Sequence, residues 1–145
     1  MTFVRDCFDT DETNISQLLT EVLKKTANYM CIDTKIDVQS DLQLSIGSVE
    51  HPGQWALKIS EALGASKYIN PLGGLEIFSP DEFTASGIEL SFLRTDLIPY
   101  PQKRNGFVPG LSIIDVMMFN EPLKCKKILE DCCLLRHDNS LKRVE

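Results

Sequence analysis

Two short stretches of the sequence combine aromatic, amide and glycine residues in the way that a site for a small polar ligand requires. In the first, Tyr100 and Gln102 belong to the run PYPQ, where Pro99 and Pro101 restrict the backbone. Prolines lower the entropy that a loop loses on ordering, so they can hold polar side chains ready for a ligand. The same two side chains could instead pin the loop to the domain, and the sequence leaves both interpretations open.

The second stretch is the loop 70–74, which contains two adjacent glycines. Gly73 and Gly74 let a ligand approach the backbone closely, and Tyr68 and Asn70 lead into the loop with groups that can bond sugar hydroxyls. Neither the dinucleotide fingerprint GxGxxG nor the GKS/T ending of a P-loop follows, so any phosphate or sugar site here is of a different kind. A plain turn, with Tyr68 packed in a sheet, is the alternative.

A third pair, Ser112 and Asp115, has the residue types of a nucleophile and an acid or base. A serine nucleophile needs a positioned base, however, and the two histidines, His51 and His137, lie in no suggestive motif. Because Ser112 follows a Pro-Gly turn and Asp115 comes three residues later, we predict a capping box at a helix start. No catalytic residue is assigned, and two histidines without a clear third ligand indicate no metal site.

Basic residues and cysteines offer further candidates. Arg94, Lys103 and Arg104 have the chemistry to bind the phosphate of a sugar nucleotide, although a solvated basic edge is the interpretation that we favour. Cys132 and Cys133 are expected on different faces of one helix, one in the core and one partly exposed. A catalytic thiol is the less favoured interpretation of this pair.

The overall composition excludes several classes of protein. The 145 residues suffice for one domain, and 15 basic against 21 acidic side chains give a net charge of -6, which argues against a broad surface for nucleic acid or anionic lipid. The five cysteines are odd in number and lack paired CxxC spacing, which indicates reduced thiols rather than a disulfide framework or a zinc ribbon. No apolar run is long enough to cross a bilayer. We therefore expect a cytoplasmic protein without membrane insertion and without a cofactor.

Periodic hydrophobic patterns predict the elements that must position these residues. Apolar residues at helical spacing indicate helices, and alternating ones indicate strands. Helices are predicted at 15–30, 52–63, 80–86, within 107–120 and at 122–135, and strands within 34–46 and at 67–70, 75–78 and 88–94. Strands alternating with helices favour an α/β fold: a single layered domain, 1–145, with a small, largely parallel sheet flanked by helices. The ends, 1–12 and 136–145, are expected to be flexible.

The stretch 107–120, FVPGLSIIDVMMFN, is the clearest single element. After its Pro-Gly turn, the apolar residues fall on nearly all sides of a helix, and they are Ile113, Ile114, Val116, Met117, Met118 and Phe119. A helix of this length that is apolar all round is expected to be buried. We therefore predict that this helix anchors the core and supports the PYPQ loop before it.

Four runs in the sequence together resemble the WbqC-like family of bacterial proteins. They are DLQLSIG, ALGASKYINPLGGLEIF, FTASGIELSFLRTDLIPYPQ and FVPGLSIIDVMMFN, and the resemblance covers about 33–120 in the order and spacing of the family. It implies an association with O-antigen and other surface-glycan gene clusters. It also implies a role in modifying amino sugars or nucleotide-linked sugars.

Members of this family resemble one another most in an amino-terminal signature of the type MQPxYFPxxGY, which does not occur here, so we expect the chain to be the carboxy-terminal portion of a longer member. We hypothesise that it binds a sugar-nucleotide-like small molecule near 70–74 and 100–102. The alternative is a truncated member that serves as a non-catalytic interaction or oligomerisation module, pairing with a second copy or with a complementary amino-terminal fragment. Whether the chain is an enzyme is left open.

Overall fold

The computed structural model describes residues 2–103, 106–136 and 142–143, and its contacts divide the chain into two compact units. Unit 1 consists of Met1–Asp41 and Leu97–Asp131, and unit 2 consists of Leu42–Asp96 and Cys132–Glu145. Each unit therefore combines two segments that are distant in the sequence. The single layered domain expected over 1–145 stays a prediction.

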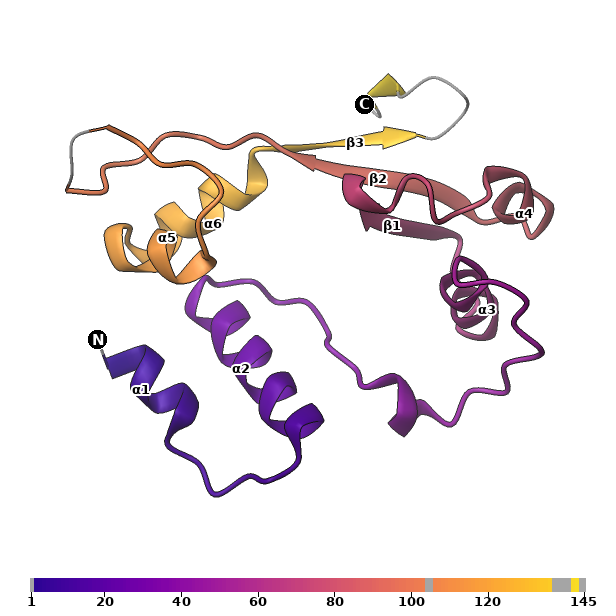
Figure 1. The fold of residues 1–145 in the computed structure, drawn as a ribbon, viewed down its shortest axis with the longest axis horizontal. Helices are drawn as coiled ribbons and strands as arrows, with labels where there is room; N and C mark the ends of the chain where they lie inside the picture. Colours follow the sequence, from indigo (N-terminus) through magenta and orange to yellow (C-terminus); the bar gives the residue numbers. More distant parts are fainter. Residues whose placement is uncertain (1, 104–105, 137–141, 144–145) are drawn as a thin grey trace. The chain divides into compact units, whose positions relative to one another are not determined.

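Helices and strands alternate along much of the chain, which confirms the α/β class (Figure 1). The helices are α1 (Thr2–Phe8), α2 (Ile15–Tyr29), α3 (Gln54–Ala62), α4 (Pro80–Ala85), α5 (Ile113–Phe119) and α6 (Pro122–Glu130). The strands are β1 (Lys67–Pro71), β2 (Glu89–Thr95), β3 (Cys132–Arg136) and β4 (Lys142–Arg143), and the short 3-10 helices are η1 (Gln39–Leu42) and η2 (Leu72–Gly74).

Unit 2 is built on a small mixed sheet with the strand order β1-β2-β3-β4. β1 runs parallel to β2, with Lys67 beside Glu89 and Asn70 beside Phe92. β3 runs antiparallel to β2, and β4 runs antiparallel to β3. With one parallel pair and two antiparallel pairs, the sheet does not confirm the largely parallel arrangement that we expected.

The core of unit 2 lies on one face of this sheet because apolar residues alternate along β2. Leu90 and Phe92 are buried and, as residues two apart in a strand, face the same side. There they join Leu57 of α3 and Phe83 of α4 in one buried cluster. The predicted strands that became β1 and β2, and the predicted helices that became α3 and α4, are confirmed.

The strand β3 corrects one prediction. We expected a single helix over 122–135, but α6 ends at Glu130 and β3 begins two residues later. The apolar spacing of this stretch fits a helix locally, yet its last part pairs with β2, where Leu135 lies beside Phe92. Pairing with a strand that is distant in the sequence therefore overrides the local periodicity.

Two other predicted strands were wrong. Residues 34–46 contain η1 and otherwise irregular backbone, so their alternating pattern finds no partner strand. Residues 75–78 belong to a turn in which the Ile77 N–H donates to the Gly74 carbonyl over 3.0 Å. Alternation is a weak signal over so few residues, because a strand also needs a neighbour to satisfy its backbone groups.

The helices α1 and α2 of unit 1 lie side by side (Figure 1). The ring centroid of Phe3 lies 5.0 Å from that of Tyr29. Asn14 caps α2, because its side-chain oxygen accepts from the amides of Ser16 and Gln17 over 2.9 and 3.3 Å. The helix predicted at 15–30 is thus confirmed, and Asn14 is its cap.

The helix α5 was expected to be buried, and this prediction was wrong. It has only seven residues, and none of them is fully buried; Ile114 and Met118 are 42% and 52% exposed. A two-turn helix that is apolar on every side needs neighbours on every side, and α5 contacts chiefly α6. The stretch 107–120 therefore does not supply the core of the molecule; the described apolar core cluster lies in unit 2.

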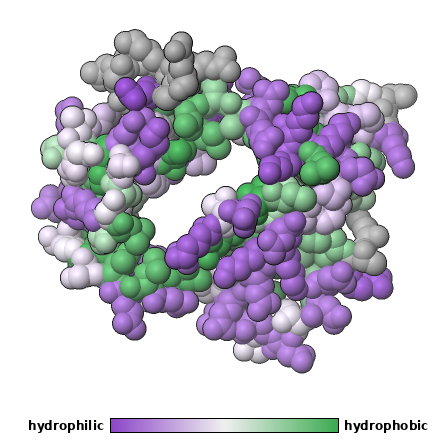
Figure 2. Space-filling view, turned by 180° about the vertical axis from the view of Figure 1, so that it is seen from behind, coloured by the Kyte–Doolittle hydropathy of each residue, from purple (hydrophilic) through white to green (hydrophobic). Residues whose placement is uncertain are grey.

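Apolar side chains reach the surface in several places (Figure 2). In unit 1 they include Ile15, Leu19 and Leu23, which recur every four residues along α2 and are 66%, 54% and 57% exposed. Residues at this spacing share one side of a helix. Together they form an exposed apolar stripe, which we call the α2 stripe.

The two ends of the chain were expected to be flexible. The structure gives residues 2–8 the helix α1, and most of the carboxy-terminal end, 137–141 and 144–145, lies outside the described residues. The flexibility of both ends stays a prediction. Within the described ranges, no helix has the length and apolar character needed to span a membrane.

Candidate functional site

The predicted ligand residues of unit 2 lie together at the carboxyl end of β1. The Tyr68 hydroxyl donates to Oδ1 of Asn70 over 3.0 Å, and Nδ2 of Asn70 donates to the Pro71 carbonyl over 2.9 Å. The Tyr68 ring packs against Phe78 and Phe83, at centroid distances of 5.4 and 5.6 Å. Burial raises the pKa of Tyr68, so its hydroxyl remains protonated at neutral pH.

The two glycines of this loop have different surroundings. A Cβ at Gly74 would collide with Nδ2 of Asn70 and would lie 2.9 Å from Cε2 of Phe78, so Gly74 is needed for the Asn70 side chain to lie where it does. A Cβ at Gly73 would meet nothing within 4 Å. Gly74 therefore has a packing role, whereas the backbone at Gly73 is open to an approaching molecule.

In unit 1, the predicted residues Tyr100 and Gln102 meet the carboxylate of Asp115. Oδ2 of Asp115 accepts from the Tyr100 hydroxyl over 2.6 Å and from Nε2 of Gln102 over 2.9 Å. Gln102 is 4% exposed and also bonds the backbone of Val108, accepting from its N–H over 2.8 Å and donating to its carbonyl over 3.1 Å. The Tyr100 ring also lies edge-to-face with Phe107, at 5.3 Å.

This network ties the PYPQ loop to the segment before α5. Both Nε2 hydrogens of Gln102 have acceptors, and its Oε1 has a donor, so the amide is engaged within the protein. Ser112 caps α5 as predicted, since its hydroxyl accepts from the Ile114 amide over 3.3 Å. Asp115, predicted as the second half of a capping box, turns its carboxylate to the loop instead. The sequence offered no signal for this, because thirteen or more residues separate the partners.

Sequence reasoning also missed a second polar cluster in unit 2. Nε2 of His51 lies 3.1 and 3.0 Å from Oε1 and Oε2 of Glu82, in the first turn of α4. Gln54 donates from Nε2 to Oε1 of Glu82 over 2.9 Å, and its own oxygen accepts from the Glu50 amide over 2.9 Å. His51 and Glu82 are 31 residues apart, and no local motif links them. Hydrogen bonds from Gln54 and then His51 lower the pKa of Glu82.

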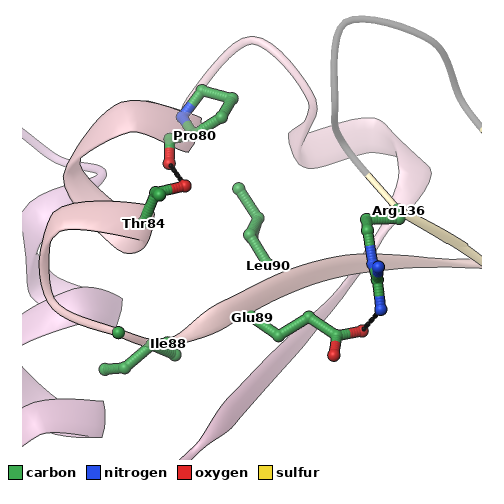
Figure 3. A pocket seen from close by; sticks show the side chains of 7 residues that line it. Pro80, Thr84, Ile88, Glu89, Leu90 and Arg136 are labelled. Carbon is green, nitrogen blue, oxygen red and sulfur yellow. Dashed lines mark hydrogen bonds and ion pairs between the residues drawn. The ribbon is translucent and has the colours of Figure 1, made fainter.

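An open cavity of about 390 Å³ lies between α4 and the start of β2 (Figure 3). This volume is in the range of small-molecule sites. The Leu90 side chain points into the space between Thr84 and Arg136. However, the Thr84 hydroxyl donates to the Pro80 carbonyl over 2.8 Å, and Arg136 is ion-paired with Glu89. Because these polar groups already have partners and none of the predicted ligand residues lines the cavity, we assign no ligand to it.

The carboxylate of Glu89 links three strands of the sheet. Its Oε1 lies 3.2 Å from Nζ of Lys67 on β1, 3.2 Å from Nη2 of Arg136 on β3, and 3.1 Å from the Ser91 hydroxyl that donates to it. Burial raises the pKa of this carboxyl, but the hydrogen bonds from Lys67, Ser91 and Arg136 outweigh burial, and the pKa of Glu89 lies below its ordinary value. The group is therefore a charged centre of cross-strand ion pairs at neutral pH.

The remaining candidates do not form a site. Nε of Arg94 lies 3.6 Å from Asp96, which fits a solvated ion pair, and Arg104 lies outside the described residues, as does His137. Cys133 is buried and Cys132 half-buried, as expected for opposite faces, but of a strand rather than a helix. All five cysteines are free. Among the described side chains, no group of three or more His, Cys, Asp or Glu residues is arranged to hold a metal ion.

Comparison with known proteins gives one match. The model of the WbqC-like protein family matches residues 1–127, which includes both groups of predicted ligand residues and the His51–Glu82 cluster. No curated protein and no solved structure matches the chain.

Proposed function

The chain belongs to the WbqC-like protein family, and from this membership we propose that it binds a sugar-nucleotide-like ligand in bacterial surface-polysaccharide (O-antigen) or amino-sugar biosynthesis. The proposed pathway is the one that the family implies, through its association with surface-glycan gene clusters. The cytoplasmic location, where sugar nucleotides are available, is part of the same proposal and agrees with five free cysteines.

The observation that carries the ligand proposal is the Tyr68–Asn70 pair beside the open backbone at Gly73. These residues end β1, which is parallel to β2, and the carboxyl ends of parallel strands are where open α/β sheets bind ligands. The pair keeps hydrogen-bonding capacity, because the Tyr68 oxygen donates its one hydrogen and can still accept, and the Asn70 amide has a second hydrogen. Ligand hydroxyls can therefore bond both groups without breaking their mutual bond.

The six residues predicted to bind the ligand take two different roles in this proposal. Tyr68, Asn70 and Gly73 contact the ligand, and Gly74 leaves room for the Asn70 side chain. In unit 1, the role proposed for Tyr100 and Gln102 is to hold the PYPQ loop in shape through Asp115. A direct contact between these two residues and a ligand stays a prediction.

Isothermal titration calorimetry with UDP-, GDP- and dTDP-linked hexoses and N-acetylhexosamines tests the proposal. The variant Tyr68→Phe removes only the hydroxyl, and we expect it to weaken binding about tenfold, which corresponds to about 1.4 kcal/mol. Tyr29→Phe in α2 is the matched control and should bind as the native protein does. The proposal fails if none of these compounds binds the folded protein, or if both variants bind equally well.

The α2 stripe favours a second candidate function, that of an oligomerisation module. Ile15, Leu19 and Leu23 are more than half exposed, and a contiguous apolar surface of this kind marks interaction sites in soluble proteins. A second copy of the chain would bury the stripe against an identical one. Light scattering over a range of concentrations should then show a dimer that Leu19→Lys dissociates, whereas a strict monomer would count against this function.

A further inference from the structure

The protonation of the His51–Glu82 pair follows from the chemistry of its members. The lowered pKa of Glu82 keeps the carboxylate ionised at neutral pH, and an ionised carboxylate can only accept hydrogen bonds. Nε2 of His51, which lies within 3.1 Å of both carboxylate oxygens, must therefore carry the hydrogen. In a neutral imidazole the other nitrogen, Nδ1, then has a free lone pair and is a base.

The Glu82 carboxylate is itself held in position. Gln54 donates to Oε1 of Glu82, and the oxygen of Gln54 in turn accepts from the Glu50 amide. A series of hydrogen bonds therefore connects the backbone at Glu50 to the imidazole through Gln54 and Glu82. His51 and Glu82 side chains are 39% and 33% exposed, so the pair is open to a ligand but partly shielded from water. A carboxylate that orients an imidazole and stabilises its charged form is the arrangement used by general bases in enzymes.

The pair also lies next to the loop of the proposed ligand site. A Cβ at Gly53 would collide with the Ile77 carbonyl oxygen and would lie 3.2 Å from Cε1 of His51, so the backbones of these two segments touch. The Ile77 amide in turn bonds the Gly74 carbonyl over 3.0 Å, and Gly74 packs against Asn70. The tight turn 74–77 thus contacts the Asn70 side chain at one end and the loop that carries His51 at the other.

We propose that His51 is the proton acceptor of a catalytic dyad, with Glu82 and Gln54 as positioning residues, acting on a hydroxyl or amino group of the ligand bound at Tyr68 and Asn70. The inference rests on the proposed function for the identity of this ligand. In the step, the O–H or N–H bond of the ligand breaks and an Nδ1–H bond forms. The electron pair stays on the ligand oxygen or nitrogen, which becomes the nucleophile, and the imidazolium is paired with the Glu82 carboxylate.

A purely structural role would use the same bonds, with the pair joining the loop before α3 to α4. The two roles differ in the reactivity of Nδ1, which a reporter reaction can measure without the natural ligand. In the hydrolysis of p-nitrophenyl acetate, Nδ1 takes a proton from the attacking water or attacks the ester carbonyl itself. Both routes need its free lone pair, and in both p-nitrophenolate leaves, acetate is released and the two protons of the water pass to the solvent. Replacing His137, the second histidine of the chain, by Gln leaves His51 as the single imidazole.

In this His137→Gln background we expect His51 to accelerate the hydrolysis, with a rate that rises as the imidazole loses its proton. Glu82→Gln should lower the rate by at least about tenfold, since the amide neither orients the ring nor stabilises the imidazolium. Glu82→Asp should restore part of it. Glu76→Gln, in the neighbouring turn, is the control and should change nothing. The charge of Lys58 also lowers the pKa of Glu82, so the pH profile should be recorded in Lys58→Gln as well.

Nitrogen NMR of the His51 ring gives the second readout. We expect the hydrogen on Nε2 in the native protein and a mixture of tautomers in Glu82→Gln. A hydrogen on Nδ1 in the native protein, or equal hydrolysis rates for the His51→Gln variant and its parent, would overturn the dyad. If Glu82→Gln fails to fold, Gln54→Ala replaces it, because this variant keeps both His51 and Glu82. An unchanged pH profile of hydrolysis in Gln54→Ala would also overturn the dyad.

A ligand titration separates this inference from the proposed function. A nucleotide sugar that binds in calorimetry should shift the His51 ring resonances. Binding without any shift overturns the dyad and leaves the proposed function standing. A reactive His51 with no nucleotide sugar bound overturns the proposed function, and with it the ligand assigned to the dyad.

Discussion

Units 1 and 2 bury different kinds of residue. Unit 2 buries large apolar side chains in one cluster, among them Phe83 and Phe92, which have almost no exposed surface. The buried residues described in unit 1 are smaller or polar, and they are Cys7, Met30, Cys125, Gln102 and Asn120. Unit 1 meanwhile exposes the α2 stripe and much of α5. Unit 2 thus has a core of large apolar side chains, whereas unit 1 buries two polar side chains, Gln102 and Asn120, beside three sulfur-containing ones.

The two units also differ in how many of their polar groups are free to contact a ligand. In unit 1, all the hydrogen-bonding groups of the Gln102 amide are bonded to Val108 and Asp115, so this network fixes the PYPQ loop. In unit 2, the apolar core carries the stability, and the polar groups of Tyr68, Asn70 and His51 keep bonding capacity toward the outside. Polar side chains whose hydrogen-bonding groups are not all bonded within the protein are the better candidates for function.

Removing a large side chain from the apolar core of unit 2 should have the greatest effect on stability. Phe92 is 0% exposed, so Phe92→Ala should lower the free energy of unfolding by about 3–5 kcal/mol, through lost burial and the cavity left behind. Urea denaturation followed by the fluorescence of Trp55, the single tryptophan and a residue of unit 2, measures it. Ile69→Ala, at a 45% exposed position on the other face of the sheet, is the control and should cost far less. Equal losses would contradict a core centred on β2.

Breaking the hydrogen bonds of Gln102 in unit 1 should also destabilise the protein. Gln102→Ala leaves the N–H and carbonyl of Val108 without their partners, so we expect a loss of about 2–3 kcal/mol. Hydrogen exchange at the Val108 amide reports the effect directly, as faster exchange in the variant. Gln39→Ala, at an exposed position, is the matched control. If exchange at Val108 is unchanged, Gln102 does not hold the loop, and its role as a ligand contact regains support.

Removing one hydroxyl should have a smaller effect. Tyr100→Phe deletes the donor to the Asp115 carboxylate, and at this half-buried position we expect the lower end of what a hydrogen bond to a charged group contributes, about 1.5 kcal/mol. Thermal unfolding measures the change, with Tyr29→Phe as the control. A loss as large as that of Gln102→Ala would mean that the tyrosine, rather than the amide, is the centre of the network.

The ion pairs of Glu89 in unit 2 should make a small contribution to stability that depends on pH. The pKa of Glu89 is lowered in the folded state, so its ion pairs stabilise the fold above the pKa of the unfolded chain, and this contribution is lost as the pH falls through the lower, folded pKa. Below about pH 4, the melting temperature should therefore fall more steeply in the native protein than in Glu89→Gln. Parallel curves would show that cross-strand ion pairs add nothing to the apolar core.

Elements with a strong local signal could be predicted from the sequence. The apolar spacing within 15–30 predicted α2, and the alternation within 88–94 predicted β2. The helix expected at 80–86 was likewise predicted, and it is α4. In each case the neighbours along the chain decide the structure, so a short window of sequence contains the necessary information.

The failures share a dependence on distant partners. β3 exists because Leu135 and its neighbours pair with β2, whereas their spacing fits a helix. Asp115 bonds Tyr100 rather than completing a cap, and His51, in the loop before α3, bonds Glu82 in α4. The candidate site divides in the same way: Tyr68 and Asn70, two residues apart, were predicted together, but the His51–Glu82 pair could not be. Tertiary contacts of this kind leave no trace in local propensity.

Because a Cβ at Gly74 would collide with the amide of Asn70, the side chains that fit at these two positions depend on each other. An alanine at 74 would not break the backbone but would push the Asn70 side chain away from Tyr68. Among relatives, a side chain at 74 should therefore appear together with a shorter residue at 70, while 73 varies independently of both. An alignment of the family would reveal this covariation, and a saturation library at 73 and 74 would show one tolerant and one intolerant position side by side.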